Sequence, residues 1–364
     1  MKSNGIRTVM ITGGAGFIGS NLAASMIGAP GVRVRILDNL SRKGVVKNLQ
    51  WLESKAGKEN LEVVIGDVRN PDVVKRAAAG AAEIYHLAAQ VAVTSSVVNP
   101  VEDFDVNARG TLNVLEAARL SGMKPFFFYT STNKVYGSLS SVAIVEGGES
   151  YRAQDPAFRG VNESQRLDFH SPYGCSKGTA DQYVRDYARI FGLPTVVFRM
   201  SCIAGPRQFG TEDQGWVAHF LYSAIAGRPI TIYGDGLQVR DVLHVHDLID
   251  AIHAARKHLD ITAGKIYNLG GGVSRAYSVL QMLRAIERCT GAVIRTRFDK
   301  LRPGDQPLYI SDTRNLEKDT GWSARRRLRD VLDDIHAFAK ENQTENGTLQ
   351  STNVPAISAL EGAA

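Results

Sequence analysis

The run Thr12-Gly13-Gly14-Ala15-Gly16-Phe17-Ile18-Gly19 decides the fold that we predict for this chain of 364 residues. Apolar residues 9–11 precede it and predict a buried strand, and residues 21–27 carry apolar side chains at helical spacing. The glycines therefore lie where a strand turns into a helix. In that turn Gly13 allows a tight bend, Gly16 lets the backbone approach a pyrophosphate, and Gly19 lets helix and strand pack closely.

An acidic residue at the end of the next strand sharpens this prediction. Residues 32–37 predict a second strand that ends in Asp38, about 20 residues beyond the glycines. A carboxylate there accepts the ribose hydroxyls of NAD and repels the 2′-phosphate of NADP, so we expect NAD as the cofactor. Arg42 and Lys43 follow closely and could hold that phosphate instead. We interpret them as side chains of a solvated loop.

Strands and helices alternate through the first half of the chain. Further apolar runs predict strands over residues 61–66, 84–89, 126–129 and 195–198. We therefore predict an α/β fold: a Rossmann doubly wound parallel sheet, with a smaller α/β substrate-binding region on its C-terminal side. Amphipathic patterns predict helices over 103–120, 173–190, 217–226 and 279–290. Ligands bind beyond the carboxyl ends of such strands, and these residues follow strands: Gly13, Asp38, Asp67, Ala88, Thr132 and Arg199.

Charge and cysteine content limit the class of protein. The 43 Lys and Arg residues against 37 Asp and Glu give a net charge of +6, but no nucleic-acid-binding motif accompanies them, so we expect no nucleic-acid partner. The three cysteines show no disulfide or metal-ligand spacing, which favours a reducing compartment. The N-terminus has no signal-peptide pattern, and no apolar stretch reaches the roughly 20 residues that span a bilayer. We expect a soluble, cytoplasmic protein without membrane association.

Tyr173 and Lys177 lie four residues apart in a predicted helix and so share one face. A tyrosine with its ordinary pKa of about 10 is a poor base at neutral pH. A lysine ammonium and an oxidised nicotinamide, both cationic, stabilise the phenolate and lower that pKa. We therefore predict that Tyr173 takes a proton from a hydroxyl group while the carbon gives a hydride to NAD.

Together these motifs resemble the extended short-chain dehydrogenases/reductases of the NAD-dependent sugar epimerase/dehydratase family, over residues 7 to about 335. The resemblance implies a third catalytic hydroxyl on Thr132, and it implies that Lys177 holds the nicotinamide ribose while Asn107 supports the site through its helix. Family members are commonly dimers through helices 103–120 and 173–190, so we expect a homodimer or homotetramer. By resemblance the cofactor contacts fall to Gly13, Gly16, Phe17, Ile18, Asp38, Asn39, Asp67, Val68, Leu87, Ala88, Ala89, Asn107, Ser131, Tyr173 and Lys177.

The two residues after Thr132 separate the two main activities of this family. In its 4,6-dehydratases an acidic residue, often an Asp-Glu pair, follows the hydroxyl residue and drives the elimination of water. Here Asn133-Lys134 follows instead. Neither side chain can act as the carboxylic acid and base that elimination needs, so an epimerase is favoured.

Longer runs resemble one branch of the family, which inverts C2 of CDP-hexoses through a transient keto sugar. They comprise residues 38–44, 131–137, 167–178, 207–209, 213–217 and 238–244. The resemblance implies a CDP-sugar such as CDP-paratose, CDP-tyvelose or CDP-glucose. One departure is Cys202, which stands where 4-epimerases carry an asparagine that contacts the nucleotide diphosphate. We assign substrate contacts to Thr94, Asn133, Cys202, Gln214, Trp216, Val217, Tyr233, Arg240 and Arg302.

Two other functions stay open from the sequence. One is a 4-epimerase of UDP- or GDP-hexoses, and the other is a non-catalytic NAD-binding sensor, although sensors often lose the tyrosine or the lysine. His244 and His246 have a metal-like spacing just before Asp247, which we expect to cap a helix. Because the sequence shows no third ligand, we interpret them as a structural pair and predict no metal.

These patterns divide the chain into two parts. We assign residues 1–200 to an NAD-binding Rossmann domain, to which residues 237–265 return. Residues 201–236 and 266–338 form the predicted nucleotide-sugar-binding region. The polar, small-residue stretch 341–364 is expected to be a disordered tail.

Overall fold

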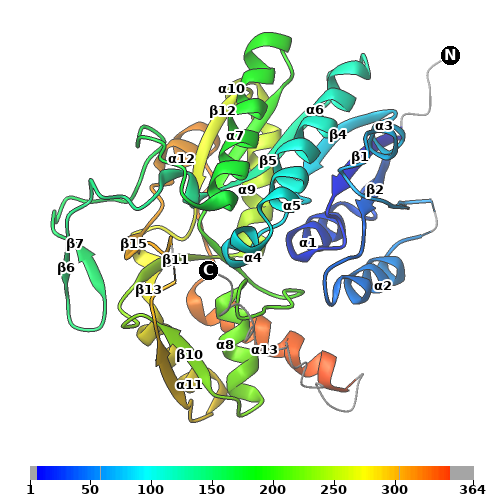
Figure 1. Cartoon of the computed structure of the whole chain (residues 1–364). Coiled ribbons are helices and arrows are strands. Elements are labelled where there is room, and N and C mark those ends of the chain that lie inside the picture. Colours follow the sequence, from blue (N-terminus) through cyan, green and yellow to red (C-terminus); the bar gives the residue numbers. More distant parts are fainter. Residues whose placement is uncertain (1–5, 58, 303, 345–364) are drawn as a thin grey trace, which may run out of the picture.

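A seven-stranded parallel sheet forms the larger half of the molecule (Figure 1). The structure is a computed structural model and describes residues 6–57, 59–302 and 304–344. The strand order is β12-β8-β5-β4-β1-β2-β3, and the order reverses between β1 and β4, where a dinucleotide binds in a Rossmann sheet. This confirms the predicted fold class. The strands are β1 (Arg7–Thr12), β2 (Val32–Asp38), β3 (Leu61–Ile65), β4 (Ala81–His86), β5 (Phe126–Thr132), β8 (Thr195–Met200) and β12 (Lys265–Leu269).

Helices cover both faces of this sheet, which is why its central strands are buried throughout. On one face α1, α2, α9 and α12 pack against strand side chains such as Ile11 and Phe128. On the other face α3, α6 and α7 pack against Met10 and Phe127. These helices are α1 (Phe17–Met26), α2 (Val45–Lys55), α3 (Pro71–Ala78), α6 (Gly110–Leu120), α7 (Ser171–Phe191), α9 (Val245–Lys257) and α12 (Arg314–Thr320).

Two predicted elements have different bounds in the structure. The strand predicted over residues 84–89 is β4, which ends at His86, because Thr12 Oγ1 accepts hydrogen bonds from the amides of Leu87 and Ala88 and turns the chain into a loop. The helix predicted over 103–120 is interrupted. It consists of α5 (Pro100–Phe104), a π-helical turn (Asp105–Arg109) and α6.

A smaller α/β region lies below the large sheet in Figure 1. Its four-stranded sheet joins β13, β11 and β15, with β9 pairing along β11, and β10 pairs with β14 beside it. The apolar faces of α8, α11 and α13 pack together on these strands. The elements are β9 (Cys202–Ala204), α8 (Trp216–Ile225), β10 (Ile230–Tyr233), β11 (Val239–His244), β13 (Ala276–Ser278), α11 (Val279–Thr290), β14 (Thr296–Asp299), β15 (Leu308–Tyr309) and α13 (Leu328–Thr344).

The division into domains stays a prediction, but the segments it rests on can now be located. Of residues 237–265, α9 packs on the large sheet whereas β11 belongs to the small one. Residues 341–344, which we expected in a disordered tail, continue α13, and residues 345–364 lie outside the described part. Short elements complete the fold: α4 (Val93–Val98), β6 (Ile144–Glu146), β7 (Tyr151–Ala153), α10 (Leu259–Thr262) and 3-10 turns at Asn133–Tyr136 and Val273–Arg275. Across the described residues, no helix has the length and apolar character needed to cross a membrane.

Candidate active site

A cavity of about 820 Å³ opens at the carboxyl ends of the central strands, between the large sheet and the smaller region. Its wall brings together residues that lie far apart in the sequence. All predicted site residues line it except Asn107 and Val217. Those that do are Gly13, Gly16, Phe17, Ile18, Asp38, Asn39, Asp67, Val68, Leu87, Ala88, Ala89, Thr94, Ser131, Thr132, Asn133, Tyr173, Lys177, Cys202, Gln214, Trp216, Tyr233, Arg240 and Arg302.

At two positions of the glycine loop a side chain would collide with neighbouring backbone atoms, so only glycine fits there. A Cβ on Gly13 would lie 2.8 Å from the amide nitrogen of Ala88, and Gly13 has a φ of +67°. A Cβ on Gly19 would lie 2.2 Å from the carbonyl oxygen of Gly13. The bare backbone therefore forms a cradle at the start of α1, whose N-terminal amides suit a pyrophosphate. The loop fits the cofactor predicted from the sequence.

Two carboxylates shape the side of the cavity next to this loop. Asp38 accepts hydrogen bonds from the amides of Ala15 and Leu40, which ties the end of β2 to the glycine loop. Asp67 accepts two hydrogen bonds from the guanidinium of Arg69 and one from Asn39, and the Arg69 bonds hold the pKa of Asp67 at about 2. Both acids are ordered before any ligand arrives, as a ribose site requires.

Tyr173 and Thr132 meet at the centre of the cavity. Tyr173 lies in the first turn of α7, Thr132 ends β5, and their side chains lie close enough in the cavity to interact. Burial raises the pKa of Tyr173 to about 12, while the Thr132 hydroxyl and the positive charge of Arg42 act against the rise. The phenol is therefore protonated in the unliganded protein and needs further positive charge to act as a base.

Lys177 lies one helical turn beyond Tyr173 and is buried. Its ammonium donates a hydrogen bond to the carbonyl of Thr130 at 2.6 Å and lies 4.3 Å from the ring centre of Tyr129. Burial lowers the pKa of Lys177 to about 7, and the carboxylates of Asp181 and Asp103 oppose this shift. The predicted pair thus lies in the cavity, with the lysine held mainly by uncharged groups.

Asn107 acts behind the cavity wall. Its side chain exchanges hydrogen bonds with the backbone of Gln90 and donates to Asp103 and Ser176, so it links the π-helical turn to α7 and to the loop after β4. This geometry suits the supporting role that the family resemblance implied. Val217 is fully buried in the core of the smaller region and does not face the cavity.

Two hydroxyl groups on the wall have no hydrogen-bond partner within the described structure. They are the buried side chains of Thr94 and Ser131, which lie beyond β4 and near the end of β5. A buried polar atom without a partner is costly, so both are poised to bind a polar ligand. This agrees with their predicted roles as substrate and cofactor contacts.

The smaller region supplies the opposite wall. The Arg302 guanidinium lies 3.8 Å from the ring centre of Tyr233 and donates to the carbonyl of Glu212, whose carboxylate accepts from the Tyr233 hydroxyl. Cys202 is half-buried beside Trp216, and desolvation raises the pKa of its thiol to about 12. The Cys202 thiol is therefore not a nucleophile at neutral pH.

Arg42 connects the two walls. It is an exposed loop side chain, as expected, but it lines the cavity and its guanidinium donates a hydrogen bond to the side chain of Gln214. Lys43 also lies on the wall. The sequence did not reveal this link, because 172 residues separate the two partners.

Lys134 and Asp305 are further cavity residues that sequence reasoning missed. We used Lys134 only to argue against a dehydratase, yet its ammonium lies on the wall and contacts the loop around Asp305. Gln306, next in that loop, accepts a hydrogen bond from Asn133 and donates to the carbonyl of Gly137. No local pattern marks this loop as a neighbour of Thr132.

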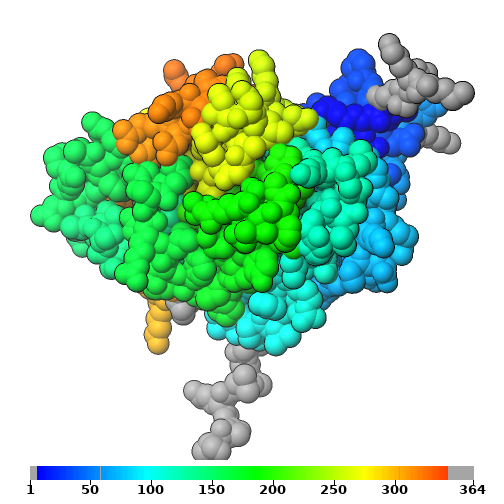
Figure 2. Space-filling model, turned by 90° about the horizontal axis from the view of Figure 1, so that it is seen from above, coloured from blue at the N-terminus to red at the C-terminus, as the bar shows by residue number. Residues whose placement is uncertain are grey.

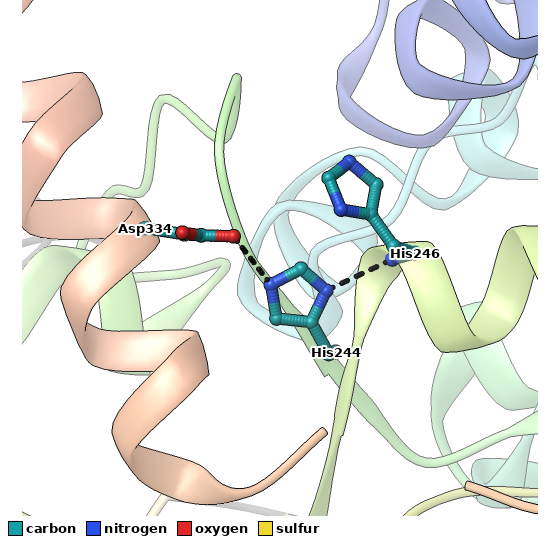
Figure 3. A group of neighbouring side chains, drawn as sticks. All are labelled: His244, His246 and Asp334. Atoms are coloured by element: carbon teal, nitrogen blue, oxygen red, sulfur yellow. Dashed lines mark hydrogen bonds and ion pairs between the residues drawn. The ribbon is translucent and has the colours of Figure 1, made fainter. Parts of the chain in front are cut away.

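The two histidines near α9 acquire a third neighbour (Figure 3). Ligand atoms of His244, His246 and Asp334 lie within 4.8 Å of one another, and Asp334 comes from α13. However, Nδ1 of His244 accepts a hydrogen bond from the amide of His246, and its Nε2 lies 3.1 Å from Asp334. A neutral imidazole that accepts at Nδ1 carries its proton at Nε2, so it has no lone pair there for a metal. His244, and not Asp247 as expected, caps α9.

Comparison with known proteins identifies the family. Residues 10–335 match a family model described as GDP-mannose 4,6 dehydratase. The chain is 43% identical to CDP-paratose 2-epimerase of Salmonella typhi, over 90% of this chain and 98% of that protein. The chain belongs to the NAD-dependent epimerase/dehydratase family. The predicted resemblance is thereby confirmed.

Solved structures of this family agree. UDP-glucose 4-epimerase of Thermotoga maritima, solved with UDP-glucose, superposes with a TM-score of 0.78 at 27% identity and covers 92% of this chain and 99% of its own. UDP-glucose 4-epimerase of Thermus thermophilus, solved with NAD, has a TM-score of 0.75 at 29% identity with the same coverage. The protein is an NAD-dependent nucleotide-sugar epimerase, and the predicted cofactor is confirmed. The sensor alternative falls away.

Proposed function

We propose that this epimerase inverts C2 of a CDP-hexose such as CDP-paratose, CDP-tyvelose or CDP-glucose. One observation favours an epimerase activity over a dehydratase activity. On the cavity wall, Thr132 is followed by an amide and an ammonium, those of Asn133 and Lys134. Neither group can supply the acid and base of water elimination. The choice of CDP and of C2 is supported by the relative that is 43% identical and bears the name CDP-paratose 2-epimerase.

Three side chains would carry the proton chemistry. Tyr173, once deprotonated, takes the proton of the C2 hydroxyl, and Thr132 hydrogen-bonds the same sugar oxygen as its charge changes. Lys177 lies one turn away on the same helix, and we infer that its protonated form stabilises the phenolate. Bound NAD supplies the remaining chemistry, the acceptance of the C2 hydride and its return to the opposite face.

Inversion requires the keto sugar to present both faces while the nucleotide stays in place. The cavity of about 820 Å³ gives the sugar room to turn. Arg240 and Arg302 lie on the wall of the smaller region, and planar guanidinium groups bind phosphate oxygens bidentately. We infer that they hold the diphosphate through the reaction.

A substrate panel tests this function. The purified enzyme is incubated with CDP-glucose, CDP-paratose, UDP-glucose and GDP-mannose without added NAD, and the products are analysed by NMR. We expect inversion at C2 of a CDP-sugar and no net oxidation. Inversion at C4 of UDP-glucose would instead support the 4-epimerase alternative. The similarity to solved UDP-glucose 4-epimerases, at 27–29% identity, is the reason to test it.

We also propose that the enzyme assembles as a homodimer, with a homotetramer as the alternative, through the segment 103–120, which includes α6, and through α7. Figure 2 shows residues 93–120, in cyan, and α7, in green, side by side on the outside of the molecule. Several apolar side chains are exposed there, including Phe104 at 49%, Leu120 at 65% and Ile190 at 66%. We infer that these exposed apolar side chains contact a second copy of the chain. Light scattering of the purified protein gives its mass directly.

A further inference from the structure

Lys134 is a half-buried cation on the cavity wall that the mechanism above does not use. Its side chain is 18% exposed, and its ammonium donates a hydrogen bond to the carbonyl of Gly304 at 3.0 Å. Its backbone amide donates to Oγ1 of Thr132, the hydroxyl that lies beside Tyr173 in the cavity. Lys134 is therefore fixed within two residues of the reacting centre.

A second cation and one carboxylate accompany it. Asp305 Oδ1 lies 3.5 Å from the Lys134 ammonium and accepts a hydrogen bond from Arg240 at 2.5 Å. The Arg240 side chain is 13% exposed. Two positive side chains thus share one negative one, and the cluster keeps one positive charge when Lys134 is protonated. This half-buried cluster has one more positive than negative charge, so an anionic ligand would balance it.

The chemistry of C2 inversion indicates which anion. C2 is bonded to the anomeric carbon, which carries the diphosphate, whereas C4 lies across the ring from it. When C2 faces Tyr173, the sugar-proximal phosphate must lie close to the catalytic hydroxyls. When C4 faces Tyr173, that phosphate lies farther away. A cation next to Thr132 can therefore bind that phosphate when C2 is the reacting carbon, but not when C4 is.

We propose that Lys134 binds the sugar-proximal phosphate of the substrate and so determines that C2, rather than C4, is presented to Tyr173. Asp305 positions the ammonium, and Arg240 contacts the same diphosphate from the other side. An ammonium paired with phosphate makes a strong, charge-assisted hydrogen bond. Burial lowers the pKa of Lys134 to about 8, so the side chain is largely protonated at neutral pH, and a bound phosphate stabilises that form further.

The proposal rests on the C2 function proposed above, and a binding experiment separates the two. Calorimetry compares CDP with cytidine, and UDP with uridine, on the NAD-loaded wild type, on Lys134→Gln and on Lys134→Arg. Lys134→Gln is expected to bind CDP at least about tenfold more weakly and cytidine unchanged, and Lys134→Arg to recover part of the affinity. Lys257→Gln, on the exposed end of α9, is the matched control and should bind CDP like the wild type.

Each outcome has a defined meaning. Unchanged CDP affinity in Lys134→Gln overturns the proposal, and so does an equal loss for CDP and cytidine, since the lysine would then have a purely structural role. A loss seen with UDP but no CDP binding at all would overturn the proposed CDP specificity while leaving the phosphate contact in place. In turnover of the CDP-hexose, Lys134→Gln should raise KM more than it lowers kcat. The reverse pattern would place the ammonium at the sugar and contradict the proposal.

Discussion

The two walls of the cavity are built differently. The cofactor wall consists of strand ends and helix starts of one parallel sheet, and its charged groups are held by backbone atoms or nearby residues, as Asp38 is by Ala15 and Leu40. The substrate wall combines strand and helix residues of the smaller region, such as Arg240 on β11, with the loop around Asp305, and its charges pair across long stretches of sequence, as Lys134 does with Asp305. A regular scaffold thus fixes the reacting groups, while charges paired between distant segments face the substrate side.

Two lysines show what this difference does. Lys177, on the cofactor wall, donates a hydrogen bond to a backbone carbonyl, and because burial lowers its pKa to about 7 it can gain or lose its proton near neutral pH. Lys134, on the substrate wall, shares the Asp305 carboxylate with Arg240. We propose that its positive charge is fully balanced only when an anionic ligand binds. The predictions that follow test this contrast, beginning with the largest expected effect.

Removal of the Tyr173 hydroxyl should nearly abolish turnover. General base catalysis contributes about 10²–10⁴-fold, so Tyr173→Phe is expected to lower kcat by that factor while NAD and CDP bind as in the wild type. Steady-state kinetics and calorimetry measure these quantities. Tyr183→Phe, an exposed tyrosine on the same helix, is the control and should be fully active. Turnover of Tyr173→Phe close to that of wild type would exclude this tyrosine as the base.

The charge of Lys177 should make the stability of the NAD-free protein depend on pH. Its folded-state pKa of about 7 lies below the ordinary value of 10.5, so the unfolded chain binds more protons between these values and stability rises with pH across that window. Lys177→Met removes this contribution. Between pH 7 and 9 the variant should gain about 2 kcal/mol less stability than the wild type.

Chemical denaturation of wild type and variant at both pH values measures this slope. The burial of Lys134 acts in the same direction above its pKa of about 8, and the raised pKa of Tyr173 lowers stability only above its ordinary value of 10. Both cancel in the difference between wild type and Lys177→Met. Equal slopes for the two proteins would show that the Lys177 ammonium is not desolvated as described.

The link between Arg42 and Gln214 should contribute a smaller amount, because it lies at an exposed part of the cavity wall. A hydrogen bond to an exposed charged group contributes about 1 kcal/mol, so Arg42→Ala and Gln214→Ala are each expected to weaken NAD or CDP-sugar retention roughly fivefold. The double variant should lose little more than either single one. Fully additive losses would mean that the two side chains act separately.

The contrast between the two walls also explains which features the sequence predicted and which it did not. The glycine loop, Asp38 and the Tyr173–Lys177 pair depend on spacings of a few residues to about 20, which periodicity and motif spacing capture. The π-helical turn around Asn107 was missed, because its apolar pattern is that of an ordinary helix. The contacts of Lys134 with Gly304 span 170 residues, and nothing in the local sequence encodes which loop closes over which strand end.

The histidine cluster gives the smallest expected effect, which is none. Its three residues lie close enough together to bind a metal ion, but the hydrogen bond accepted by Nδ1 of His244 places the proton of that imidazole on Nε2, which then cannot bind a metal. Treatment with EDTA, or addition of equimolar Zn²⁺, should leave both turnover and Tm unchanged. His244→Ala, by contrast, removes the cap of α9 and the contact with Asp334, and should destabilise the fold by about 1 kcal/mol. The opposite result would be a Zn²⁺-dependent rise in the Tm of the wild type that is absent in His246→Ala. It would mean that the cluster binds the metal and that the imidazole of His244 gives up its hydrogen bond to α9 to do so.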